Sequence, residues 1–181
     1  YSSNSFIAWG LGEMGDYEGA IRHWTAAHEA AKPLGGRLLL GEWLAAIEAE
    51  TLLGSGDPVS ALKKGEEALA IAKAAGSVIA EALAERAIGR VLAGGPSSQW
   101  AEADAHLTKS VSLMEGIGAK FDLVRALLAQ GRLRSAQGDW NSSATQLKRA
   151  VALAGECGLQ REEKIARDLL AAAEGRGAKL T

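Results

Sequence analysis

The chain has 181 residues and a mass of 18.8 kDa, and its 20 basic and 22 acidic residues give a formal charge of −2. This length predicts one domain, residues 1–181, that buries about 70% of its unfolded surface and needs no disulfide to fold. The balanced charge gives no general attraction to phosphate backbones or anionic lipids, and the single cysteine excludes an intramolecular disulfide. We therefore expect a cytoplasmic protein without a nucleic-acid or membrane partner.

Four glycines at a regular interval mark the predicted ends of four helices. Gly35, Gly76, Gly118 and Gly158 are separated by 41, 42 and 40 residues. Glycine takes the left-handed conformation of a helix C-cap without steric cost. A helix is expected to begin 18 residues before each glycine, because aspartate suits the N-cap and proline suits the first helical position. These starts are Tyr17, Pro58, Trp100 and Trp140, and three of them follow Asp16, Asp57 and Asp139.

A further helix is predicted ahead of each of these starts, and one more at the end of the chain. The predicted ranges are 2–14, 37–54, 78–93, 120–137 and 160–174. A small residue, Ala8, Ala49 or Gly131, precedes three of the starts by nine residues, whereas Gly89 precedes its start by eleven. We assign the two extra residues to the turn 94–99, since a surface turn tolerates insertion. The prediction is four helical hairpins, 1–35, 36–76, 77–118 and 119–158, and a final helix.

A period of about 41 residues with two amphipathic helices in each unit is typical of an all-α solenoid. The first unit resembles the tetratricopeptide repeat (TPR) at the small, turn and packing positions of that motif, which are Ala8, Gly15, Tyr17, Ala20, Trp24 and Ala27. The long period is similar to that of repeats in bacterial maltose-type transcription activators and ATPase-linked nucleotide cyclases. The resemblance implies a right-handed superhelix of antiparallel helix pairs that serves as a protein-binding scaffold in a larger signalling protein.

Motifs for catalysis and metal binding are missing or have a simpler interpretation. Residues 10–15 match G-x-G-x-x-G, but no strand precedes them, so we interpret them as a helix end and its turn. The three histidines lack metal-ligand spacing. Cys157 lies near a predicted helix C-terminus, where the helix dipole disfavours a thiolate. We therefore expect that this segment is not an enzyme and holds no metal or other cofactor.

In tetratricopeptide arrays the first helix of each repeat lines a concave groove, and the resemblance implies which positions face it. The candidate partner-binding residues are Trp9, Trp43, Glu50, Arg86, Arg90, Arg125, Arg132 and Asp168. Arg86 and Asp168 lie three residues before the small residue of their helices, and the same position in the other helices is occupied by Ser5, Ala46 and Leu128, which are also expected to face the groove. Four arginines facing one groove favour an acidic peptide or protein loop as partner, since a guanidinium fork matches a carboxylate. The alternative is local neutralisation of the arginines by Glu81, Glu85 or Asp122.

Two other functions stay open on the sequence. In a ligand-sensing regulatory domain, Trp9 and Trp43 stack on a small molecule, whereas in a scaffold they cover the seam between repeats. In a self-association module, exposed repeat ends stack to form a homo-oligomer. Counting back from Tyr17 places the start of the first helix about four residues ahead of Tyr1, and we expect the segment to come from a longer chain.

Overall fold

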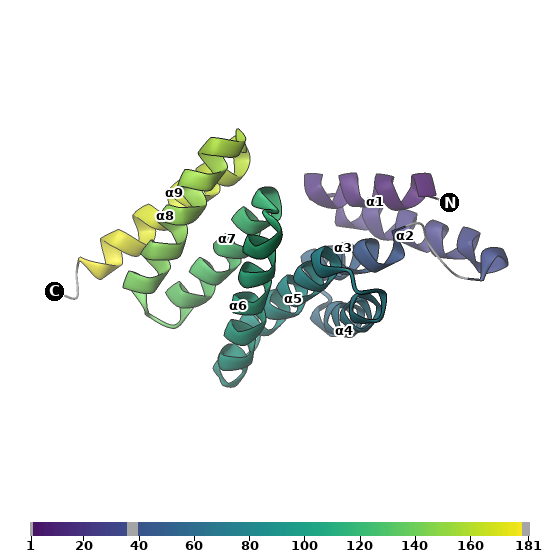
Figure 1. The fold of residues 1–181 in the computed structure, drawn as a ribbon, viewed down its shortest axis with the longest axis horizontal. Helices are drawn as coiled ribbons and strands as arrows, with labels where there is room; N and C mark the ends of the chain where they lie inside the picture. Colours follow the sequence, from purple (N-terminus) through teal and green to yellow (C-terminus); the bar gives the residue numbers. More distant parts are fainter. Residues whose placement is uncertain (1, 36–39, 179–181) are drawn as a thin grey trace. The chain divides into compact units, whose positions relative to one another are not determined.

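A computed structural model of the chain describes residues 2–35 and 40–178. Over these residues the chain forms nine α-helices and two short 3-10 helices and contains no strand, as the sequence predicts (Figure 1). The elements are α1 (Ser2–Met14), α2 (Tyr17–Ala31), η1 (Lys32–Leu34), α3 (Gly41–Gly54), α4 (Pro58–Ala75), α5 (Val78–Ala93), η2 (Ser97–Gln99), α6 (Trp100–Ile117), α7 (Lys120–Ala136), α8 (Trp140–Cys157) and α9 (Gln160–Gly177).

The three predicted aspartate N-caps are confirmed, and three of the four predicted cap glycines end an α-helix directly, whereas Gly35 ends the 3-10 helix η1. The carboxylates of Asp16, Asp57 and Asp139 accept hydrogen bonds from the backbone N–H three residues ahead, at 2.9, 3.0 and 3.0 Å. Gly118 ends α6 with a φ of 68°, and the other three predicted cap glycines also have positive φ. Local side-chain and glycine chemistry therefore sets the helix limits here.

The first hairpin departs from the predicted equal helix lengths. Helix α2 has 15 residues, whereas α4, α6 and α8 have 18 each. Pro33 lies just after α2, and its ring and missing N–H stop an α-helix from continuing. The backbone instead forms the 3-10 helix η1, which is capped by Gly35. The next helix begins at Gly41 and not at 37, after Leu40 with a φ of 55°. Residues 37–39 of the predicted helix lie outside the described residues.

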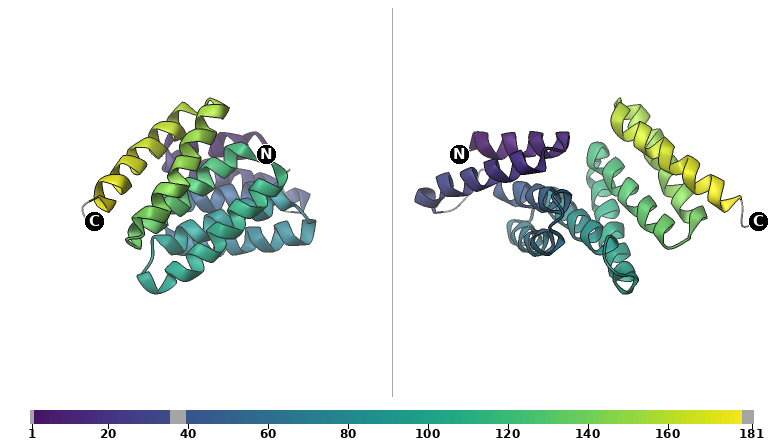
Figure 2. Two further views of the ribbon diagram at one scale, coloured as in Figure 1. Left: turned by 60° about the vertical axis from the view of Figure 1, so that its left-hand side comes forward. Right: turned by 180° about the vertical axis from the view of Figure 1, so that it is seen from behind.

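The chain divides into two compact units, Tyr1–Val91 and Leu92–Thr181, with the division inside α5. In the first unit α1 packs on α2 and α3 on α4, and both α1 and α2 touch α3. In the second unit α6, α7, α8 and α9 pack each on the next, and α7 also touches α9 (Figure 2). Neighbours in sequence are thus neighbours in space within each unit. The single domain expected from the sequence stays a prediction.

Small residues lie where the two helices of a hairpin cross. Ala8 and Ala49 are fully buried, and a Cβ added at Gly131 of α7 would lie 2.7 Å from Cγ of Leu147 on α8. Such contacts let helices approach to the usual 8 to 10 Å between axes. The inserted turn at 94–99 contains η2, and Gly94, Pro96, Ser97 and Ser98 are exposed, as predicted. No helix in the described part of the chain has the length and apolar character needed to cross a bilayer.

Candidate functional site

Helix α3 carries two glutamates that face different neighbours. Glu48 and Glu50 are two positions apart, which places them roughly 200° apart around the helix. Glu50 faces α5, and Glu48 faces α2 and α4. Two separate polar clusters therefore form around one helix of the first unit.

The first cluster consists of Glu50, Arg86 and Arg90, and we call it the Glu50 cluster. Arg86 Nε donates to Glu50 Oε1 at 2.7 Å, and Arg90 Nη1 lies 3.1 Å from Glu50 Oε2. Arg86 and Arg90 are four residues apart on α5 and so share one side of that helix. Each carboxylate oxygen thus has its own guanidinium, which is a strong charge-assisted arrangement.

The two arginines of the Glu50 cluster differ in exposure. Only 3% of the Arg86 side chain is exposed, against 35% for Arg90. The expectation that Arg86 lines an open groove is therefore wrong, because its guanidinium is buried against the carboxylate of α3. Arg90, in contrast, keeps about a third of its side chain exposed to solvent.

The other predicted positions in the register of Arg86 are also mostly buried. Ser5, Ala46 and Leu128 have almost no exposed surface, whereas Asp168 is exposed. Three residues on a helix correspond to a rotation of 300°, so this position lies only about 60° from the tightly packed small residue. Packing at the small residue therefore covers it. The predicted groove register is wrong at these buried positions.

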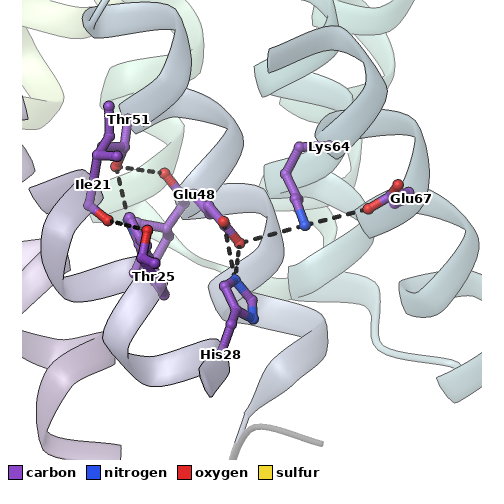
Figure 3. Close-up of polar contacts among 9 residues, drawn as sticks. Ile21, Thr25, His28, Glu48, Thr51, Lys64 and Glu67 are labelled. Atoms are coloured by element: carbon purple, nitrogen blue, oxygen red, sulfur yellow. Dashed lines mark hydrogen bonds and ion pairs between the residues drawn. The ribbon is translucent and has the colours of Figure 1, made fainter. Parts of the chain in front are cut away.

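The second cluster joins three helices through Glu48 (Figure 3). His28 Nε2 of α2 lies 3.0 Å from both carboxylate oxygens of Glu48, and Lys64 Nζ of α4 lies 3.6 Å from Oε2. Lys64 is also 3.3 Å from Glu67 one turn further along α4. This Glu48 cluster was missed in the sequence, because no local pattern distinguishes Glu48 from a solvated glutamate. Its contacts hold α2, α3 and α4 together.

The predicted arginines of the second unit are held differently from each other. Arg125 Nη2 of α7 lies 3.1 Å from Glu162 Oε1 of α9, and its guanidinium carbon lies 4.4 Å from the centre of the Phe121 ring. Arg132 is exposed on the same helix. Asp168 of α9 is exposed and pairs with Lys164 at 2.6 Å. The ion pair with Glu162 thus ties Arg125 of α7 to α9.

Trp9 of α1 and Trp43 of α3 pack on each other. Their ring centroids are 4.9 Å apart at an angle of 80°, an edge-to-face geometry. Trp43 packs against a buried cluster of Ala8, Trp24 and Leu44. Trp9 Nε1 donates to Glu13 at 3.3 Å. The pair therefore covers the contact between the first and second hairpins.

The structure brings together two subsets of the predicted site, the Glu50 cluster and the tryptophan pair. Arg86 and Arg90 lie in the first unit and Arg125 and Arg132 in the second, and their convergence on one groove stays a prediction. Among the described side chains, no group of three or more His, Cys, Asp or Glu residues is placed to hold a metal ion. The sequence matches no protein-family model and no curated protein. The tetratricopeptide resemblance therefore stays a prediction as well.

Proposed function

We propose that this chain is a protein-interaction module that binds an acidic peptide, or an acidic loop of another protein, through Arg90. The observation that supports the proposal is that Arg86 and Arg90 both pair with the single carboxylate of Glu50. Two guanidinium groups meet one carboxylate, so these three groups together carry one net positive charge. Because Arg90 is partly exposed, its remaining N–H donors suit a second carboxylate supplied by a ligand.

The buried member of the Glu50 cluster supports this role for Arg90. Arg86 and Glu50 are fixed between α3 and α5, and their ion pair restrains the carboxylate that orients Arg90. A donor that is already oriented loses less side-chain entropy when it binds a ligand. The exposed Arg132 on α7 is a second candidate contact in its own unit.

The wider proposal is a tetratricopeptide-like array with a right-handed superhelix, acting as a non-catalytic scaffold in a cytoplasmic bacterial signalling protein. It is supported by four hairpins of similar length, by the repeated cap glycines and by the small residues at the helix crossings. In the alternative function, a ligand sensor, Trp9 and Trp43 would stack on a small molecule. Their edge-to-face packing on each other favours a structural role at the seam between repeats instead.

The experiment is a titration of the chain into a fluorescein-labelled poly-glutamate peptide, followed by fluorescence anisotropy at low and high salt. We expect saturable binding that weakens as salt rises, because exposed charge pairs are screened over about 10 Å at 0.1 M. Replacing Arg90 and Arg132 together by alanine should weaken binding by about 1 to 3 kcal/mol. A neutral Gly-Ser peptide of equal length should not bind.

The matched control is Arg22→Ala in the same unit as Arg90. Arg22 is exposed on α2 and has an ion pair only one turn away, with Glu18 at 2.6 Å. Its loss should leave peptide affinity unchanged. Equal weakening by Arg22→Ala and by the double replacement would show general charge attraction and contradict a site at Arg90.

A further inference from the structure

Helix α3 keeps one stripe of partly exposed side chains among well-buried ones. Trp43, Ile47 and Glu50 lie at positions i, i+4 and i+7, so they share one side of the helix. All three are partly exposed, whereas Leu44 and Ala49 have almost no exposed surface. We call Trp43, Ile47 and Glu50 the α3 stripe.

The α3 stripe stays accessible although α3 has neighbours from both directions along the chain. Helices α1 and α2 precede α3 and contact it, α4 follows and packs on it, and α5 pairs with it through Glu50. The side of α3 that carries Glu48 and Thr51 is covered by α2, to which both residues are hydrogen-bonded. The exposure of the stripe is therefore set by how these helices pack around α3.

The α3 stripe changes from apolar to charged along its length. At one end, Trp43 packs edge to face on Trp9 of α1, and Trp43 and Ile47 cover the buried cluster between the first two hairpins without being buried themselves. At the other end, Glu50 holds the partly exposed Arg90 of α5. An apolar surface and an accessible guanidinium thus lie next to each other in the first unit.

The rise of the α-helix sets the distance between these two surfaces. At 1.5 Å per residue, Ile47 lies about 4.5 Å and Trp43 about 10.5 Å from Glu50 along the axis of α3. In an extended peptide, side chains two residues apart point to the same face and are separated by about 6.6 Å. A peptide that runs along α3 with a carboxylate at Arg90 therefore places the side chain two residues away between Ile47 and Trp43.

We propose that the Arg90 site recognises an extended segment with an acidic residue and, two positions away, a large apolar residue. This inference rests on the proposed acidic ligand and narrows it. The carboxylate binds Arg90, and the apolar side chain packs across the exposed parts of Trp43 and Ile47. An aromatic side chain fits best, because contacts between aromatic rings gain more than their buried area.

The apolar contact supplies selectivity that the charge alone does not. A single exposed charge pair contributes little to affinity, so Arg90 by itself distinguishes poorly between acidic segments. Tryptophan is also among the residues that contribute most at protein interfaces. Trp43 and Ile47 therefore select the segments in which an apolar residue accompanies the acidic one at the right spacing.

The test uses three fluorescein-labelled heptapeptides of equal side-chain charge. The first, Glu-Trp-Gly-Glu-Gly-Trp-Glu, has a tryptophan two positions from the central glutamate on both sides, so it fits Arg90 in either chain direction. The second, Trp-Glu-Gly-Glu-Gly-Glu-Trp, has the same composition, but an odd number of positions separates each tryptophan from every glutamate. In the third, Glu-Gly-Gly-Glu-Gly-Gly-Glu, glycine replaces both tryptophans.

The peptides are titrated with the intact chain and followed by anisotropy. We expect at least tenfold higher affinity for the first peptide than for the other two. Ile47→Gln should reduce this preference to within twofold, because glutamine is of similar length but removes the apolar contact. The matched control is Ile71→Gln on α4, since Ile71 is 47% exposed in the same unit, and the tenfold preference should persist. Arg90→Ala should weaken the binding of every peptide.

The outcomes separate this inference from the proposed function. Equal affinity for the first two peptides overturns the inference, and this comparison needs only the parent chain. If the third peptide still binds and loses affinity in Arg90→Ala, the acidic-peptide site stands without the apolar contact. No saturable binding of any peptide contradicts the proposed function itself. Full affinity of the first peptide for Arg90→Ala also overturns the inference, because its tryptophan would then bind apart from Arg90.

Discussion

Glu50 of α3 accepts a hydrogen bond at 2.7 Å from Arg86 of α5, although the two residues are 36 positions apart and the arginine side chain is almost completely buried. An arginine in the interior is tolerated only where a carboxylate compensates its desolvation. The pair therefore fixes α5 against α3 and, through the second carboxylate oxygen, positions Arg90. Glu50 thus both stabilises the packing of α5 on α3 and orients Arg90, the proposed contact for an acidic partner.

Replacing Glu50 by alanine should lower the free energy of unfolding by about 3 kcal/mol, because a buried guanidinium then loses its carboxylate. Urea denaturation followed by far-UV circular dichroism measures this. The control is Glu67→Ala, since Glu67 is half exposed in its ion pair with Lys64 and should cost less than about 1 kcal/mol. An equal loss of unfolding free energy in the two variants would show that Glu50 does not compensate the desolvation of Arg86.

Replacing glycine by alanine should change the stability in opposite directions at two helical positions of the second unit. Gly131→Ala should destabilise the chain by about 1 kcal/mol or more, because the new methyl group would overlap Leu147 of α8. Gly116→Ala on α6 should stabilise by up to about 1 kcal/mol, since its Cβ meets nothing within 4 Å and alanine favours helix. Thermal unfolding of both variants decides the point. A stabilising Gly131→Ala would contradict the close crossing of α7 and α8.

Helix limits could be predicted from the sequence because short-range chemistry decides them. Asp139 caps α8 with its own side chain, and Gly118 ends α6 by its backbone freedom. Ion-pair partners could not be predicted in the same way. Glu162, which holds Arg125, comes from another helix and lies 37 positions away in the sequence. Only the packing of α7 on α9 brings these two side chains together.

Burial within one helix was also beyond the sequence. Arg86 and Arg90 are the same residue type on the same side of α5, one turn apart. Arg86 is buried, whereas Arg90 is partly exposed. The neighbouring helices therefore cover one turn of α5 more completely than the next. The repeat register identified both as candidate binding residues, and only the structure separates the buried arginine from the partly exposed one.

The conformation of Gly118 provides a test of the predicted repeat boundary. Gly118→Val should cost about 1 kcal/mol or more, because a β-branched residue is strained at a φ of 68°. Inserting two residues between Gly95 and Pro96 should cost much less, since the turn lies on the surface and loop entropy grows slowly with length. Chemical denaturation of both variants measures the difference. An insertion as costly as the valine would contradict the surface position of the turn.

Stability should fall in acid partly through the N-cap of α8. Hydrogen bonds from the side chain and backbone of Ser142 lower the pKa of Asp139 below its ordinary value. A lowered pKa in the folded state means that this stabilisation is complete above about pH 4 and is lost as pH falls through the folded pKa. Asp139→Ala should thus cost about 1 kcal/mol at neutral pH and progressively less in acid. Thermal unfolding of both proteins over a pH series tests this, and a pH-independent difference would contradict it.

The most direct test of the proposed function is a nuclear magnetic resonance titration of the 15N-labelled chain with unlabelled poly-glutamate peptide. Recognition through Arg90 predicts that the largest changes in amide shifts, and in the Arg90 Nε–H signal, occur on α5 and α3 around Glu50. The changes should saturate with peptide and diminish as salt rises. No saturable change, or changes centred on helices other than α3 and α5, would contradict the assignment of Arg90 as the contact for an acidic partner.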